Sequence, residues 1–197
     1  VVLYGQRQVV ADVQLAETTR DALSIAVARA KIDYRSGQGT AQIMAEGRNG
    51  VPFKVAGNAA FTPDMWRIAA KGRANSIDFE TDGPVRIALQ GDSYRILPSS
   101  VKVGRGGNVR VAGVYGDAID IQSRLENVHI GILNPMLPDI GVGGRARGSF
   151  DWYQASANAF PRADARLTVD DFTRTSISGV SQPVDIALVG RLLPDGG

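Results

Sequence analysis

Cysteine is absent from this chain of 197 residues, and histidine occurs once. Without cysteine, a disulfide framework and thiolate metal sites are excluded, although cytosol and periplasm remain equally open. The single imidazole, His129, lies between Val128 and Ile130, and no Gly-x-Ser-x-Gly segment accompanies it. We therefore interpret His129 as an outward-facing strand residue, and we expect no enzymatic activity, no metal site and no cofactor.

An excess of one charge is also lacking, since 22 basic and 20 acidic residues give a net charge of +2. The two signs alternate along the chain, which disfavours nucleic-acid binding. Two carboxylate pairs, Asp170 with Asp171 and Asp117 with Asp120, lie beside turns or along predicted strands, and no oxygen-rich loop resembles a calcium site. We interpret both pairs as solvated surface.

Long hydrophobic runs are missing as well, because no segment reaches the roughly 18 apolar residues of a membrane-spanning helix. No signal-peptide pattern is present. The first residue is Val1, not methionine, residues 1–4 have the pattern of mid-strand, and residues 194–197 that of a bare turn. We expect the chain to be a single segment, 1–197, of a larger protein whose membrane anchor would lie outside it.

What the sequence does contain is alternation. Between residues 39 and 91, apolar side chains recur at every second position, as in Val51, Phe53 and Val55, with polar residues such as Lys54 between them. This period is typical of strands that have one apolar and one polar face. Turn signals such as Asn49-Gly50 and Asp82-Gly83-Pro84 separate the segments.

The same pattern continues to both sides. Strands are predicted over residues 8–15, 109–115, 118–125, 142–153, 163–169 and 184–192. Residues 23–34 are rich in alanine and would also suit a helix, but their neighbours alternate and we predict a strand. One short helix is predicted near 131–138, where Ile132, Leu133 and Met136 have helical spacing. The fold class is therefore all-β, a long, curled, mostly antiparallel sheet of about a dozen strands.

Alternation also divides the side chains between the two faces of this sheet. The predicted inner face consists of Phe53, Val55, Trp66, Ile68, Ile87, Leu89, Val109, Val111, Ile119, Ile121, Phe150 and Trp152. The predicted outer face includes Lys54, Arg67, Arg86, Arg110, Asp120 and Asp151. The inner face could be a packed core or an apolar trough for acyl chains, and both require the same alternation.

Several segments resemble the TamB family, the inner-membrane-anchored component of the translocation and assembly module of Gram-negative bacteria, which is related to AsmA-like proteins. The resemblance rests on the Asp-Tyr-Arg-Ser-Gly-Gln-Gly run at 33–39, residues 45–48 with Pro52 and Phe53, and residues 94–98, 113–116 and 125–150. It implies a β-taco, a half-pipe of stacked strands with an apolar inner surface, and a mid-length slice of a long periplasmic protein.

The resemblance implies a function too. Such a trough would conduct phospholipid between the inner and outer membranes and support outer-membrane biogenesis, with an Omp85-type outer-membrane barrel as partner outside this segment. Phospholipid acyl chains would be the ligand, and membrane contact would come only through flanking regions. Two alternatives stay open: a chaperone-like scaffold for outer-membrane β-barrel proteins, which requires an exposed sheet edge, and a closed structural β-domain, which requires an inaccessible interior.

Overall fold

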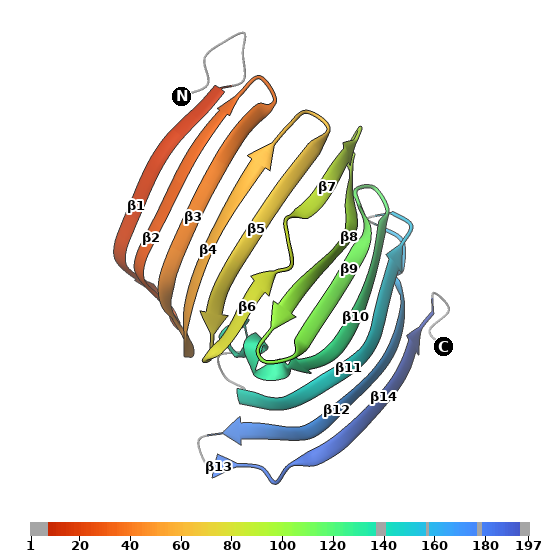
Figure 1. Cartoon of the computed structure of the whole chain (residues 1–197). Coiled ribbons are helices and arrows are strands. Elements are labelled where there is room, and N and C mark those ends of the chain that lie inside the picture. The colour runs from red at the N-terminus through yellow and green to blue at the C-terminus, as the bar shows by residue number, and fades with distance from the viewer. Residues whose placement is uncertain (1–7, 137–140, 157, 177–178, 194–197) are drawn as a thin grey trace.

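The computed structural model describes residues 8–136, 141–156, 158–176 and 179–193. They form one sheet of fourteen strands and one short helix (Figure 1). Every strand pair in the sheet is antiparallel. The predicted fold class is thus confirmed, including the strand interpretation of residues 23–34. The expectations for residues 1–4 and 194–197 lie outside the described residues.

The elements follow one another with short turns. They are β1 (Gln8–Arg20), β2 (Leu23–Arg35), β3 (Gln38–Asn49), β4 (Val51–Phe61), β5 (Met65–Ala74), β6 (Ile77–Thr81), β7 (Val85–Gln90), β8 (Ser93–Val103), β9 (Gly107–Tyr115), β10 (Ile119–His129), η1 (Ile130–Met136), β11 (Gly141–Gln154), β12 (Arg162–Ser176), β13 (Gly179–Val180) and β14 (Val184–Leu192).

Strand order follows chain order except at two places: β7 in the middle of the sheet, and β14, which pairs with β12 as β13 does. One end of β5 pairs with β6 and the other end with β7, and both then pair with β8. The link between β6 and β7 is the predicted turn at Asp82, Gly83 and Pro84, where Gly83 has a φ of +82°. Pro84 has no N–H to donate, so the ladder cannot continue through it.

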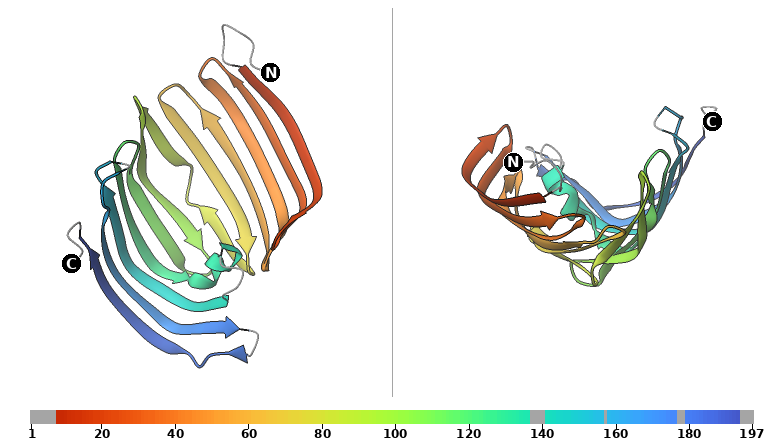
Figure 2. Two further views of the ribbon diagram at one scale, coloured as in Figure 1. Left: turned by 180° about the vertical axis from the view of Figure 1, so that it is seen from behind. Right: turned by 90° about the horizontal axis from the view of Figure 1, so that it is seen from above.

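The sheet curls into a U when it is seen from above, with β1 to β3 in one arm and β12 and β14 in the other (Figure 2). The helix η1 lies inside the U (Figure 2). There Ile132 packs against a cluster formed by Ile77, Val103 and Val128. We call the side that holds η1 the concave face and the opposite side the convex face.

Little of this molecule is buried. Within the described residues, the buried apolar side chains are Ala74, Ile77, Val103, Val128 and Ala146, and no large side chain is fully buried. All five belong to the concave face by strand register, near the end of the sheet where η1 lies. The core is therefore a small cluster beneath η1, and the rest of the concave face has no covering layer among the described residues.

The structure contains the short helix predicted near 131–138. This helix, η1, is a 3₁₀ helix over Ile130–Met136 with Pro135 inside it, and residues 137 and 138 lie outside the described part. Short 3₁₀ pieces are common as connectors, and a proline in the helix interior removes the donor that an α-helical turn would need.

Asparagine side chains hold η1 against three parts of the sheet. Asn49 donates to the carbonyl of Pro135 at 2.7 Å, and Asn75 donates to the carbonyl of Gly131 at 3.2 Å. The buried Asn134 bonds Val142 twice: its amide donates to the carbonyl at 3.2 Å and its oxygen accepts from the N–H at 2.9 Å. These bonds link the β3–β4 and β5–β6 turns to the start of β11.

Replacing Asn134 should loosen this end of the sheet. Asn134→Ala leaves the N–H and carbonyl of Val142 without their partner, so we expect the free energy of unfolding to fall by about 1–3 kcal/mol in urea denaturation. The control is Asn58→Ala, because Asn58 is an exposed amide on the convex face. Equal stability of the two variants would show that the bonds between Asn134 and Val142 do not stabilise the fold.

Both outer strands of the sheet have a free edge within the described residues, since β1 pairs only with β2 and β14 only with β12. Free edges of this length are templates for pairing with another chain. We therefore expect concentration-dependent self-association in analytical ultracentrifugation. Val10→Lys with Val189→Lys, at exposed positions on these two strands, should suppress it, whereas Thr40→Lys with Gln122→Lys on interior strands should not. A protein that stays monomeric at all concentrations would contradict this expectation.

Candidate functional site

The concave face is the surface that the sequence pattern predicted to be functional. Because residues directly opposite in neighbouring strands point to the same side, the registers assign each side chain to a face. Phe61 lies opposite Trp66, Trp66 opposite Ile87, and Ile121 opposite Trp152. Continued across the sheet, the registers place all twelve predicted inner residues on the concave face and the six predicted charged residues on the convex face.

This face is open to solvent. Each of the twelve predicted residues is half-buried, and none is fully buried. Other apolar side chains of the same face are more exposed still, among them Leu15 at 51%, Ile43 at 52% and Leu188 at 51%. A contiguous apolar surface of this kind is typical of a binding site. The arrangement presents hydrocarbon side chains to solvent across the described part of this face.

An aromatic row crosses one end of the concave face. Tyr34 and Phe61 meet edge to face with ring centroids 6.2 Å apart, and Phe61 meets Trp66 in the same way at 5.6 Å. Tyr94 follows at 5.4 Å from Trp66. Gly39 lies between Tyr34 and Phe61 in the ladder, so the two rings meet above a residue without a side chain. The row is at the opposite end of the strands from η1 and makes the two ends of the concave face different.

Small residues form the middle of the concave face in β2 to β5. Gly57 lies opposite Ile43 on one side and Ala70 on the other, and Ala30 lies opposite Ile43 from β2. A packed core would fill such positions with large side chains. Here the alanines and the glycine leave Ile43 half exposed in the interior of the sheet, which gives space above the strands.

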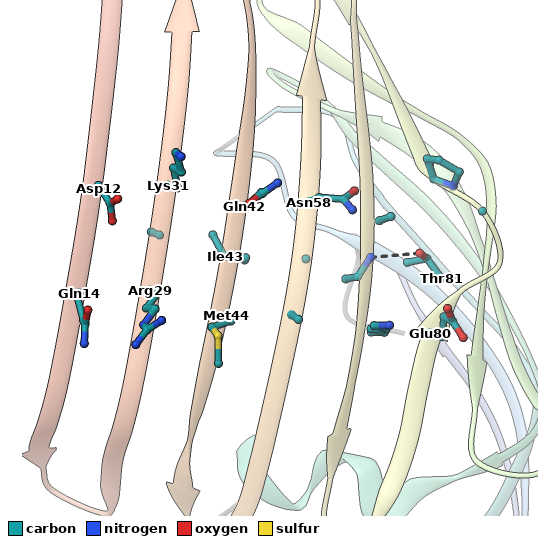
Figure 3. A pocket seen from close by; sticks show the side chains of 18 residues that line it. Asp12, Gln14, Arg29, Lys31, Gln42, Ile43, Met44, Asn58, Glu80 and Thr81 are labelled. Atoms are coloured by element: carbon teal, nitrogen blue, oxygen red, sulfur yellow. Dashed lines mark hydrogen bonds between the residues drawn. The ribbon is translucent and has the colours of Figure 1, made fainter.

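The convex face is polar, and two of its shallow hollows lie on either side of the turn between β6 and β7. The first has a volume of about 820 Å³, and its lining includes Asp12, Lys31, Gln42, Asn58 and Glu80 (Figure 3). The side chain of Thr81 accepts a hydrogen bond from the N–H of Ala70 at its border, at 3.2 Å (Figure 3). The mixed charges and amides of this hollow fit a solvated surface.

The second hollow has a volume of about 850 Å³ and lies over β5 and β7 to β11. Arg67, Arg86, Arg110 and Arg124 line it. This cluster could not be recognised in the sequence, because the four arginines are spread over 58 positions and come together only through strand pairing.

His129 ends β10 opposite Arg145, on the convex side of the sheet. Its Nδ1 accepts a hydrogen bond from the N–H of Gly131 at 3.3 Å. Partial burial lowers the pKa of the imidazole below 6.5, and the nearby Arg145 lowers it further. The described part of the chain contains no group of three or more histidines and carboxylates that could hold a metal ion.

The predicted carboxylate pairs lie on exposed or half-buried strand and turn positions. Asp170 accepts a hydrogen bond from Arg147 at 3.3 Å. Asp171, with a φ of 52°, donates its N–H to Asp185 at 3.0 Å at an irregular point of the ladder between β12 and β14. Asp170 and Asp171 therefore form hydrogen bonds to neighbouring strands at the surface of the sheet.

Comparison with protein-family models, curated proteins and solved structures found no match. Among the described residues, no helix has the length and apolar character required to cross a membrane.

The lowered pKa of His129 predicts a pH dependence of stability. The unfolded chain binds a proton at about pH 6.5 and the folded chain only below that value, so stability is complete above pH 6.5 and falls as the pH drops toward the folded pKa. Since the chain has one histidine, a single imidazole signal in proton NMR gives the folded pKa directly. His129→Gln should remove this part of the pH dependence in urea denaturation, and an NMR pKa above 6.5 would contradict it.

Proposed function

We propose that the concave face binds phospholipid acyl chains and that the chain is a segment of a periplasmic protein that conducts phospholipid between the inner and outer membranes. The observation that supports this best is the apolar concave face, which is covered only by η1 among the described residues. A closed structural domain would bury this surface, whereas here β1 and β14 remain unpaired on their outer sides in the described sheet.

Energetics favour such a surface as a carrier. Burying one methylene group is worth about 0.8 kcal/mol, so moving a chain of some sixteen carbons through water costs roughly a dozen kcal/mol. An apolar trough replaces one hydrocarbon environment with another and removes most of this cost. The polar convex face keeps the segment hydrated. No catalytic residue is needed.

The compartment and the partner come from the sequence resemblance to the TamB family. It suggests a long periplasmic protein that is anchored in the inner membrane and meets an Omp85-type barrel at the outer membrane. The curled sheet with one apolar face fits the half-pipe expected of that family. Support for outer-membrane biogenesis follows as part of the same proposal.

A second candidate function has its own observation. The free outer edges of β1 and β14 could pair with strands of an unfolded outer-membrane protein, as a chaperone-like scaffold would require. The two functions differ in what they capture. Phospholipid that organic solvent extracts from the purified protein supports the conduit, whereas binding of β-strand peptides without bound lipid supports the scaffold.

A charge on the concave face should weaken acyl-chain binding. Ile43→Arg places a guanidinium where the side chain is already half exposed, so the fold should tolerate it. The desolvation of this charge against a hydrocarbon costs a few kcal/mol, and we expect the affinity for a phospholipid with a fluorescent acyl chain to fall by about tenfold or more.

The matched control is Gln42→Arg, which adds the same charge one residue earlier, on the convex face. Circular dichroism should show the same β-structure in both variants. If folded Ile43→Arg binds the fluorescent phospholipid as tightly as the unchanged protein and the Gln42→Arg control, the concave face is not the acyl-chain site.

A further inference from the structure

Opposite charges face each other across the strands over much of the convex face. Lys54 lies opposite Glu46 with their charged atoms 3.1 Å apart, and Arg73 lies opposite Asp78 at 2.6 Å. Arg191 lies opposite Asp164 at 2.9 Å. Such cross-strand pairs stabilise a sheet modestly, and like charges in the same positions destabilise it.

Two pairs of arginines break this pattern in the second hollow. Arg67 on β5 lies directly opposite Arg86 on β7, and Arg110 on β9 lies directly opposite Arg124 on β10. The acidic pair of Asp151 and Asp164 differs, because Arg191 neutralises Asp164. Packing gives no reason for the arginine pairs, since all four side chains are exposed.

These arginines are largely uncompensated. Arg67, Arg86 and Arg124 have neither an ion pair nor a side-chain hydrogen bond within the described residues, and Arg110 alone pairs with a carboxylate, Glu126, at 3.5 Å. Two aspartates also line the hollow. Lys102 already engages Asp82 at 2.8 Å, which leaves Asp151 as the one free acid in the described lining.

We propose that this hollow is a binding site for a phosphate group, either free or in a lipid headgroup. Guanidinium groups recognise phosphate oxygens through paired N–H donors, and several arginines around one anion relieve the repulsion that they otherwise exert on each other. Ser100 lies opposite Arg110 on the same face and also lines the hollow, and its hydroxyl donates a hydrogen bond to the side-chain oxygen of Asn108. The site lies on the face opposite to the acyl-chain surface and does not depend on the function proposed for that surface.

The test compares two double variants that lose the same charge. Arg86→Gln with Arg124→Gln removes one arginine from each pair. Arg48→Gln with Arg105→Gln removes two exposed arginines that do not line the hollow. Calorimetric titration with inorganic phosphate at constant ionic strength, and flotation with phosphatidylglycerol or phosphatidylcholine vesicles, are measured for both variants and for the unchanged protein.

We expect the unchanged protein and the control to bind, and the hollow variant to lose affinity by about tenfold or more. A difference with inorganic phosphate assigns the site to free phosphate. A difference only with phosphatidylglycerol vesicles assigns it to a lipid headgroup. If the hollow variant and the control behave alike with every probe, the proposal is wrong. The Ile43→Arg variant should bind phosphate as the unchanged protein does. Failure of the acyl-chain proposal can therefore be distinguished from failure of the phosphate proposal.

Thermal unfolding without ligand gives a second readout. Because each arginine pair is repulsive, the hollow variant should have the same midpoint as the control or a higher one. A clearly lower midpoint would show that the arginines stabilise the sheet, and the argument from like charges would be overturned.

Discussion

Hydrogen bonds between neighbouring strands connect β1 to β14 through one continuous antiparallel ladder, and the rest of the structure depends on that ladder. In most domains the ladder and a buried core share this task. Here five apolar side chains are buried among the described residues, so each strand is held mainly by its two neighbours. The stability of such a molecule should be close to a sum of contributions from neighbouring strand pairs, as it is in repeat proteins. A change at one strand interface should therefore affect stability mainly at that interface.

The exception is the end of the sheet under η1. There Val103, Ile77 and Val128 come together from three strands, and Asn134 satisfies both polar groups of Val142. Here, as in the aromatic row at the other end of the strands, side-chain packing joins strands that are not adjacent in the ladder. The helix thereby ties the β3 and β5 side of the U to β11 and helps to fix the curvature of the sheet at that end.

Much of this arrangement could be predicted from the sequence, because a period of two assigns side chains to faces without knowledge of partners. Val184–Leu192 forms a strand with the predicted bounds. The type of η1 could not be predicted, since Ile132, Leu133 and Met136 suit either kind of helix. The β5–β6 turn, where Asn75 and Ser76 both have positive φ, lacks glycine and proline and gave no strong turn signal. The arginine hollow could not be predicted either, because it depends on which strands pair and in what register.

Alternation alone also cannot distinguish a core from a binding surface, and exposure is what separates them here. A core position becomes inaccessible because a second layer lies over it, and among the described residues only η1 supplies such a layer. At Ile43 the neighbours in the ladder are alanine and glycine, so even the strands beside it leave the side chain in contact with solvent. An apolar surface that the described residues do not cover carries a hydration cost that a bound hydrocarbon would remove. This exposure is the physical reason for our proposal that the concave face binds acyl chains.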